Sequence, residues 1–155
     1  MSATDADDKI LTRTEGAVQW LIFNQPEKHN ALSLGMTERA FEVIQDFDRN
    51  EDLRVLILAG AGDKAFVSGA DISEFDKHRH DAASAEHYHQ LSNGMFDALY
   101  DCSKPTIALI DGYCFGGGVA LAASCDMRYC SDDALFAVPA ALAFAVMLFL
   151  MLLGV

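Results

Sequence analysis

The feature that most constrains the fold is the stretch DGYCFGGGVALAASCD, residues 111–126, in which three consecutive glycines lead directly into small apolar residues. Glycine loses more backbone freedom on folding than any other residue, so a triplet inside regular structure implies a use for bare backbone. The run TIALID, residues 106–111, precedes it and is typical of a buried strand. We therefore expect a strand, a tight glycine turn and a short helix packed through small side chains.

The remaining strand signals lie on both sides of this segment. Residues 9–14 and 17–24 are strand-like runs that flank Glu15 and Gly16, a plausible hairpin turn. RVLILAG, residues 54–60, is a short apolar run that ends in glycine, as a buried parallel strand would. After the glycine triplet, MRYCS and LFAV indicate two later strands.

Two longer helices are predicted from apolar periodicity. Ser33 can cap a helix over residues 34–49, in which apolar side chains recur at helical spacing. A second helix is expected over residues 83–101, with Asn93 and Gly94 as a weak point. AGDKAFVSGADISEF is interpreted as a loop in which Asp71 caps the next turn. We find no linker and no strong repeat, so we predict one α/β domain.

Composition excludes some partners. The 155 residues are 52% hydrophobic and carry a net charge of −12, which fits one globular domain and argues against nucleic acid as a partner. An anionic small molecule could still bind at a local basic patch. The candidate residues for such a patch are Lys28, His29, Lys64, Lys77 and Arg79.

The N-terminus lacks a secretory pattern and the four cysteines form no C-x-x-C pair, so a cytoplasmic location is expected.

The residues argue against three other chemistries. The histidines of HRH and HYH do not share a helix face, and no cysteine or carboxylate set completes a metal site, so we expect no metal. The spacing of GYCFGGGVA does not match the dinucleotide fingerprint, and AGDKAF lacks the residues of a phosphate loop. GYCFG resembles the elbow of a nucleophilic thiol, but no histidine follows it, which favours Cys114 as a small buried residue.

Two glycine turns, around Gly69 and around residues 116–118, are each expected where a strand ends and a helix begins. Backbone N–H groups at such turns lack helical acceptors and suit a developing negative charge. A pair of them converging on one oxygen would form an oxyanion hole. The alternative is that both turns are merely tight.

Three segments together carry a family resemblance: NQPEKHNALS, AFVSGADISEF and KPTIALIDGYCFGGGVALAASCDMRYCSDDALFAVP. In their order and separation they resemble the crotonase superfamily, the enoyl-CoA hydratase/isomerase family, over about residues 9–139. The resemblance implies an α/β fold, a spiral of strand–strand–helix units of the ClpP/crotonase type. It also implies an acyl-CoA thioester as ligand, with no separate cofactor, and a role in fatty acid metabolism.

The resemblance implies particular site residues. The two oxyanion-hole N–H groups would belong to Ala70 and Gly117, the positions we expect to be catalytic. The further expected contacts with the acyl-CoA are Lys28, Ala31, Ser68, Asp71, Ile72, Phe115, Gly116 and Pro139.

The sequence departs from the family pattern where acids are expected. Family hydratases carry one glutamate just after the glycine triplet and a second after the later proline, whereas this chain has Ala120 and Ala140. Alanine cannot transfer a proton, so hydration should be severely impaired. We therefore expect an acyl-CoA-binding member of the hydratase/isomerase class, a lyase by family. The alternative is a non-catalytic acyl-CoA-binding protein or inactive fragment.

The end of the chain also departs from the family. Residues 134–155 hold no charged side chain, whereas the family continues with mixed sequence and a helical region that forms trimers. We divide the chain into a flexible N-terminus, 1–8, an acyl-CoA-binding domain, 9–139, and an apolar tail, 140–155. An altered or truncated C-terminus is favoured over a membrane anchor or a tail covered in an oligomer. With the full C-terminus, a homotrimer or hexamer would be expected.

Overall fold

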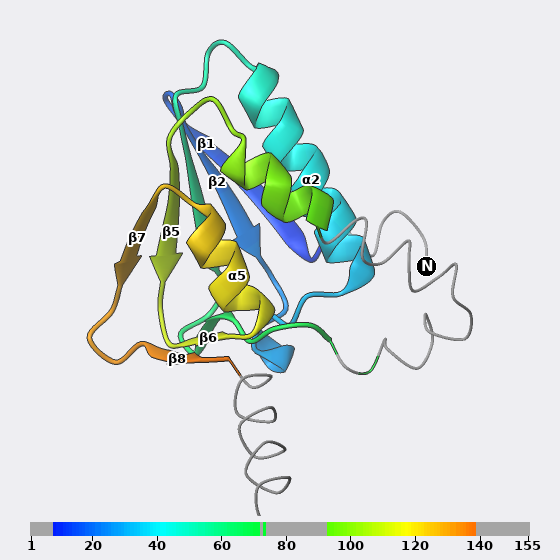
Figure 1. Ribbon diagram of the computed structural model, residues 1–155, viewed down its shortest axis with the longest axis vertical. Helices are drawn as coiled ribbons and strands as arrows, with labels where there is room; N and C mark the ends of the chain where they lie inside the picture. Colours follow the sequence, from blue (N-terminus) through cyan, green and yellow to red (C-terminus); the bar gives the residue numbers. More distant parts are fainter. Residues whose placement is uncertain (1–7, 72, 74–92, 139–155) are drawn as a thin grey trace, which may run out of the picture.

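The computed structural model describes residues 8–71, 73 and 93–138. Its first elements are a hairpin and a long helix (Figure 1). Strands β1 (Ile10–Glu15) and β2 (Val18–Phe23) pair antiparallel around Gly16, whose φ of 59° supports the predicted turn. A short 3-10 helix η1 (Pro26–Lys28) precedes helix α2 (Leu34–Arg49).

Helix α2 begins where the sequence predicted. The Ser33 hydroxyl accepts a hydrogen bond from the Met36 amide at 3.2 Å, which satisfies one of the free N–H groups of the first turn. Its buried stripe contains the four apolar residues whose spacing predicted the helix, Met36, Ala40, Val43 and Phe47. Residues 93–100 form a second helix, in which Met95 and Leu99 are buried. The rest of the expected helix over 83–101, including Tyr88 and Leu91, lies outside the described residues.

The remaining strands alternate between two sheets. In chain order they are β3 (Val55–Gly60), β4 (Ala65–Val67), β5 (Thr106–Ile110), β6 (Tyr113–Phe115), β7 (Met127–Cys130) and β8 (Leu135–Ala137), with helix α5 (Gly117–Ser124) between β6 and β7. One sheet has the order β1-β2-β3-β5-β7 and the other has the order β4-β6-β8. From β3 onward every pairing within the two sheets is parallel.

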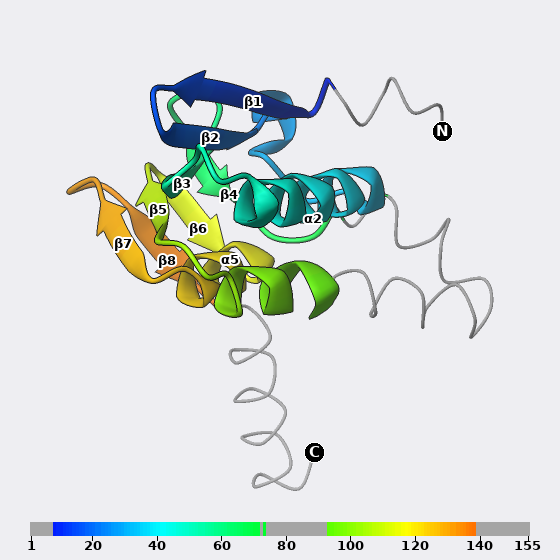
Figure 2. The same cartoon turned by 90° about the horizontal axis from the view of Figure 1, so that it is seen from above.

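This alternation is the spiral that the family resemblance implied. Each turn places one strand in the five-stranded sheet and the next in the three-stranded sheet, and residues 93–100 and α5 follow as helices. Figure 1 shows β6 and β8 running across below the carboxyl ends of β5 and β7. Figure 2 shows α2, the helix 93–100 and α5 on one side of the larger sheet.

Two strands were missed in the sequence. We interpreted residues 61–75 as loop, and the structure forms β4 at Ala65–Val67; we expected a single glycine turn after the strand ending near residue 110, and the structure inserts β6. Each has three residues and directly precedes a glycine turn, so we interpreted its residues as part of the turn. Both strands pair with partners distant in sequence, which stabilises them despite their length.

Candidate functional site

The candidate site lies where β4 and β6 end, because these neighbouring strands lead into the two glycine turns. Gly69 has a φ of 110° and Gly116 a φ of 51°, backbone conformations that residues other than glycine rarely adopt. A Cβ placed on Gly117 would lie 3.9 Å from the Ala70 nitrogen, and one placed on Gly69 would lie 3.8 Å from the Gly117 nitrogen. The two turns therefore touch through backbone.

The three glycines of the triplet differ in what a side chain at each position would disturb. Gly116 supplies the positive φ from which helix α5 starts. At Gly117 a Cβ would make only ordinary contacts with the Ala70 turn, at 3.8–3.9 Å, whereas at Gly118 a Cβ would overlap the Val67 carbonyl oxygen. Bare backbone therefore lets α5 lie against the end of β4 with its first N–H groups beside the other turn.

An isolated parallel β-bridge between Leu32 and Ala70 sets the direction of the Ala70 amide. The Leu32 amide donates to the Gly69 carbonyl at 2.7 Å, and the Asp71 amide donates to the Leu32 carbonyl at 2.8 Å. In such a parallel bridge the middle residue directs its own N–H away from the partner segment. Ala70 therefore points its amide away from Leu32.

Neither the Ala70 amide nor the Gly117 amide donates a hydrogen bond within the part of the chain that the structure describes. Gly117 is the first residue of α5, where helical N–H groups have no acceptor one turn earlier and the helix dipole is positive. Two such donors from adjacent turns can stabilise negative charge on one oxygen.

The loop of residues 24–33 is tied to the Ala70 turn by an ion pair. The Lys28 Nζ donates to Asp71 Oδ2 at 2.6 Å and to the Ser73 hydroxyl at 3.2 Å. Burial raises the pKa of the Asp71 carboxyl, but hydrogen bonds from Lys28 and Ser73 outweigh it, so the pKa lies below its usual value of 3.8. The Ser73 amide donates to Asp71 Oδ1 at 3.0 Å, as predicted for a cap.

The structure brings the expected contact residues together on this loop and turn. The Ser68 amide donates to the His29 carbonyl at 3.1 Å, and the Ala31 amide donates to the Lys28 carbonyl at 3.1 Å. The Phe115 carbonyl oxygen lies 3.4 Å from a Cβ placed on Gly69, so Phe115 borders the same turn. Ile72, Pro139 and Ala140 lie outside the described residues.

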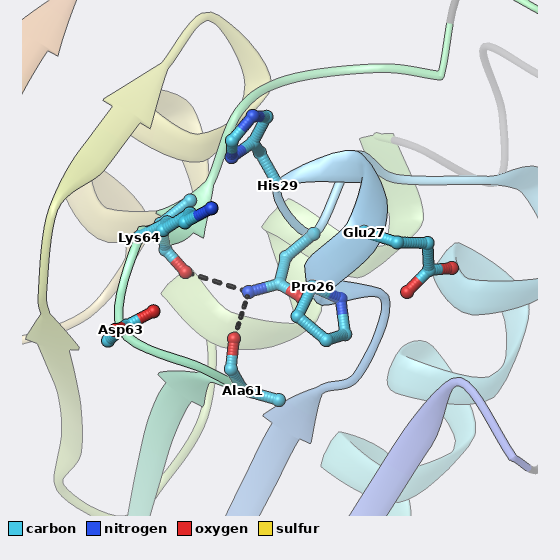
Figure 3. Close-up of a pocket in the computed structure, with 8 residues that line it drawn as sticks. Pro26, Glu27, His29, Ala61, Asp63 and Lys64 are labelled. Atoms are coloured by element: carbon cyan, nitrogen blue, oxygen red, sulfur yellow. Dashed lines mark hydrogen bonds between the residues drawn. The ribbon is translucent and has the colours of Figure 1, made fainter.

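Sequence reasoning missed Asn30, which holds the loop in shape. Asn30 is fully buried with a φ of 54°, and its Oδ1 accepts from the Gln25 amide at 2.9 Å. Its Nδ2 donates to the Ala61 and Ala65 carbonyls at 2.9 and 2.7 Å, the dashed lines of Figure 3. The signal in the sequence was weak, because an asparagine in a loop is common and its acceptors lie some thirty residues away.

Part of the predicted basic patch gathers beside this loop. A pocket of about 280 Å³ is lined by His29 and Lys64 with acidic Asp63 and Glu27, and Figure 3 shows His29 and Lys64 at the same end of it. The His29 ring packs edge-on against Tyr113 at 5.7 Å, and Tyr113 lies 5.1 Å from Phe115. The aromatic rings connect this pocket to the glycine turn. Lys77 and Arg79 lie outside the described residues.

Cys114 is a buried residue, as the sequence favoured. It is 0% exposed, and burial raises the pKa of its thiol to about 11. A nucleophilic cysteine needs the thiolate, which is scarce near pH 7 at such a pKa.

In the described part of the chain no three histidine, cysteine or acidic side chains lie together as a metal site. No helix among the described residues is long and apolar enough to cross a membrane.

With this geometry in place, comparison with known proteins settles the family. Residues 13–146 match the sequence profile of the enoyl-CoA hydratase/isomerase family. The chain belongs to this family. This confirms the crotonase-superfamily resemblance drawn from the three sequence segments.

Individual relatives agree with this membership. The chain is 37% identical over 139 residues to a peroxisomal Delta(3,5)-Delta(2,4)-dienoyl-CoA isomerase from Arabidopsis thaliana, covering 83% of this chain and 50% of the relative. It is 34% identical over 132 residues to a short-chain-enoyl-CoA hydratase from Clostridium acetobutylicum, covering 85% of this chain and 50% of the relative. The chain thus spans about half the length of these curated relatives.

A solved structure confirms the fold. The crystal structure of an enoyl-CoA hydratase/carnithine racemase from Magnetospirillum magneticum matches with a TM-score of 0.81 and 39% identity. The match covers 86% of this chain and 50% of that chain. The mixed α/β spiral is therefore the fold of known members of the family.

Proposed function

We propose that this chain binds an acyl-CoA thioester and polarises its carbonyl between the amides of Ala70 and Gly117. The observation that carries the proposal is the contact between the two glycine turns, each with an N–H that donates to no acceptor in the described residues. Relatives named as a dienoyl-CoA isomerase and an enoyl-CoA hydratase support a CoA thioester as the ligand.

The residues around the hole suit the rest of the ligand. Lys28 is partly exposed and places its ammonium beside the Ala70 turn through Asp71. Lys64 lines the adjacent pocket together with His29 and places an ammonium group beside the acidic Asp63 and Glu27. We propose that this loop, with Ala31 and Ser68, binds the phosphate-bearing part of the ligand, and that Phe115 borders the thioester.

A second candidate, binding without hydration, is favoured by the absence of an acid at Ala120. This residue is exposed on the first turn of α5, three residues beyond Gly117, and its methyl group cannot transfer a proton. The nearby Asp71 carboxylate is engaged by Lys28 and Ser73. Positioned general acids and bases typically supply about 10²–10⁴ in rate, so the chain should bind enoyl-CoA far better than it hydrates it.

Hydration is tested with crotonyl-CoA as the substrate. The reaction is monitored by the loss of absorbance of the conjugated thioester. We expect a rate close to the uncatalysed one for the wild-type chain. The double variant Ala120→Glu with Ala140→Glu should raise the rate where the rest of the pocket is intact. Robust hydration by the wild-type chain would show that other residues supply the protons and would refute the non-hydratase interpretation.

Binding is tested by calorimetric titration with acyl-CoA and with free CoA. The wild-type chain should prefer acyl-CoA, since only the thioester places a carbonyl between the two amides. Gly117→Pro removes one N–H and should abolish the preference. Gly117→Ala is the matched control, because it keeps the N–H and its Cβ would meet neighbours at 3.7–3.9 Å, an ordinary contact. Equal affinity of the wild-type chain for both ligands would overturn the assignment.

A further inference from the structure

Leu32 contacts both glycine turns of the site. Its amide donates to the Gly69 carbonyl at 2.7 Å and its carbonyl accepts from the Asp71 amide at 2.8 Å, so its backbone holds the residues on either side of Ala70. Its side chain reaches the other turn, since a Cβ placed on Gly117 would lie 3.7 Å from Leu32 Cδ1. One residue therefore lies against both segments that carry the proposed oxyanion-hole amides.

The three segments meet on one side of Gly117. The same Cβ would lie 3.8 Å from the Gly69 Cα and 3.9 Å from the Ala70 nitrogen. The Leu32 δ-methyl group, the Gly69 backbone and the Ala70 amide thus gather at that point at ordinary van der Waals distances. Because Leu32 is only 6% exposed, its side chain makes this contact inside the protein and not at its surface.

The position of Leu32 is itself fixed by its neighbours in the chain. Ser33, the next residue, caps α2 by accepting from the Met36 amide at 3.2 Å and is 2% exposed. Asn30, two residues earlier, is 0% exposed and donates to the Ala65 carbonyl at 2.7 Å. Leu32 is therefore held between a capped helix end and a buried, hydrogen-bonded side chain.

The ion pair between Lys28 and Asp71 also joins this loop to the Ala70 turn, but it constrains the turn less. The Lys28 side chain is 44% exposed, so solvent screens the pair. A lysine has a flexible stem, which can follow small movements of Asp71 without breaking the pair. The contacts of Leu32 involve backbone groups and a buried branched side chain, which leave less freedom to move.

We propose that Leu32 is a positioning residue, which sets the distance and direction between the Ala70 and Gly117 amides through the backbone of both turns. The proposal rests on the proposed function, because the spacing of these amides matters only where they bind the thioester oxygen. Two donors stabilise one oxygen only when both lie within hydrogen-bond distance of it. Loss of the Leu32 methyl groups should let the Gly117 turn move into the space they leave, which lengthens one of the two bonds.

The test is infrared spectroscopy of butyryl-CoA, labelled with ¹³C at the thioester carbonyl and bound at saturation to variants at position 32. The wild-type chain should lower the carbonyl frequency relative to buffer. Leu32→Ala leaves the backbone bridge in place and should lose most of this shift. Its preference for butyryl-CoA over free CoA should fall about three- to tenfold, the effect of weakening one hydrogen bond. Leu32→Met has nearly the same volume and should retain the shift.

The matched control is Leu53→Ala. Leu53 is 6% exposed, as Leu32 is, and follows the opposite end of the 16-residue helix α2, which is about 24 Å long. Both substitutions remove the same atoms from a buried site and should lower the urea midpoint of unfolding to a similar extent. Only the substitution at Leu32 should change the carbonyl frequency. Where Leu32→Ala does not fold, Leu32→Val takes its place, with a shift between those of the wild type and buffer.

The outcomes separate this inference from the proposed function. A wild-type carbonyl frequency equal to that in buffer would overturn both, because no pair of donors would then act on the oxygen. A wild-type shift that persists unchanged in the folded alanine or valine variant would overturn the positioning role alone. An equal loss of the shift in Leu53→Ala would also overturn it, since the effect would then follow stability and not the contact with Gly117.

Discussion

At the scale of single residues, Asp71 links the two loops of the site. Its carboxylate accepts from Lys28 Nζ at 2.6 Å and from the Ser73 hydroxyl at 2.6 Å, and it directly follows Ala70 in the chain. The side chain of Asp71 is 6% exposed, while that of Lys28 is 44% exposed. Solvent screening at the lysine limits the stabilisation by the pair to about 1 kcal/mol.

Asp71→Asn should lower stability in a way that depends on pH. The pKa of Asp71 in the fold lies below its usual value of 3.8, so its carboxylate stabilises the fold above that pH. This contribution is lost as the pH falls through the lowered pKa. Urea unfolding should therefore show the variant less stable than the wild type at pH 7, with the difference shrinking below pH 3.8.

The matched control for this experiment is Glu42→Gln, which breaks the exposed pair between Arg39 and Glu42 on α2. Exposed helix pairs at i,i+3 spacing contribute about 0.2–0.5 kcal/mol, so the control should change stability little. A difference between the wild type and Asp71→Asn that stays constant from pH 7 to the acid limit would contradict the ion-pair account.

Residues with local roles could be predicted from the sequence, and residues with distant partners could not. Ser33 was predicted as a cap because its partner, the Met36 amide, is three residues away. Asn30 escaped notice because it joins Gln25 to the carbonyls of Ala61 and Ala65, a relation that only the folded chain reveals. The lysine at position 28 was predicted to bind ligand, but its pairing with Asp71 was not foreseen.

At the scale of elements, α5 is placed by the absence of a side chain at Gly118. The nearest atom to a Cβ there is the Val67 carbonyl oxygen of β4. The helix therefore rests on the strand backbone, and the amide of Gly117 is held beside Ala70 as a result.

Gly118→Ala should destabilise the fold by about 1–3 kcal/mol, because α5 has to move away from β4. The variant should also weaken the preference for acyl-CoA over CoA. Gly94→Ala is the control with the opposite expected sign, since its Cβ would lie 3.7 Å from the Phe41 ring and alanine favours a helix. Thermal unfolding measures both, and a Gly118→Ala protein as stable as the wild type would contradict the packing argument.

The longer elements were predictable, and so was the three-residue strand β8 from the run LFAV, but the three-residue strands β4 and β6 were not. The periodicity of α2 and the apolar runs of β3 and β5 each extend over enough residues to show a pattern. Strands β4 and β6 have three residues each, and both were interpreted as parts of loops. Their positions matter for function, because the glycine turns follow these two strands and not β3 and β5.

At the scale of the whole molecule, the site exists because the spiral brings two turns together. Ala70 and Gly117 belong to successive strand–strand–helix units, and the pairing of β4 with β6 sets them side by side. The family resemblance predicted these two positions from motif alone. The contact between the turns rests on pairing between distant strands, which no local pattern in the sequence contains.

The central claim, that Ala70 and Gly117 polarise a thioester carbonyl, is tested most directly by isotope-edited infrared spectroscopy. A ¹³C-labelled thioester carbonyl should absorb at lower frequency when bound to the wild-type chain than in buffer, because two fixed donors withdraw electron density from it. In Gly117→Ala the shift should persist, whereas in Gly117→Pro it should be lost. A carbonyl frequency in the wild-type complex equal to that in buffer would contradict the account.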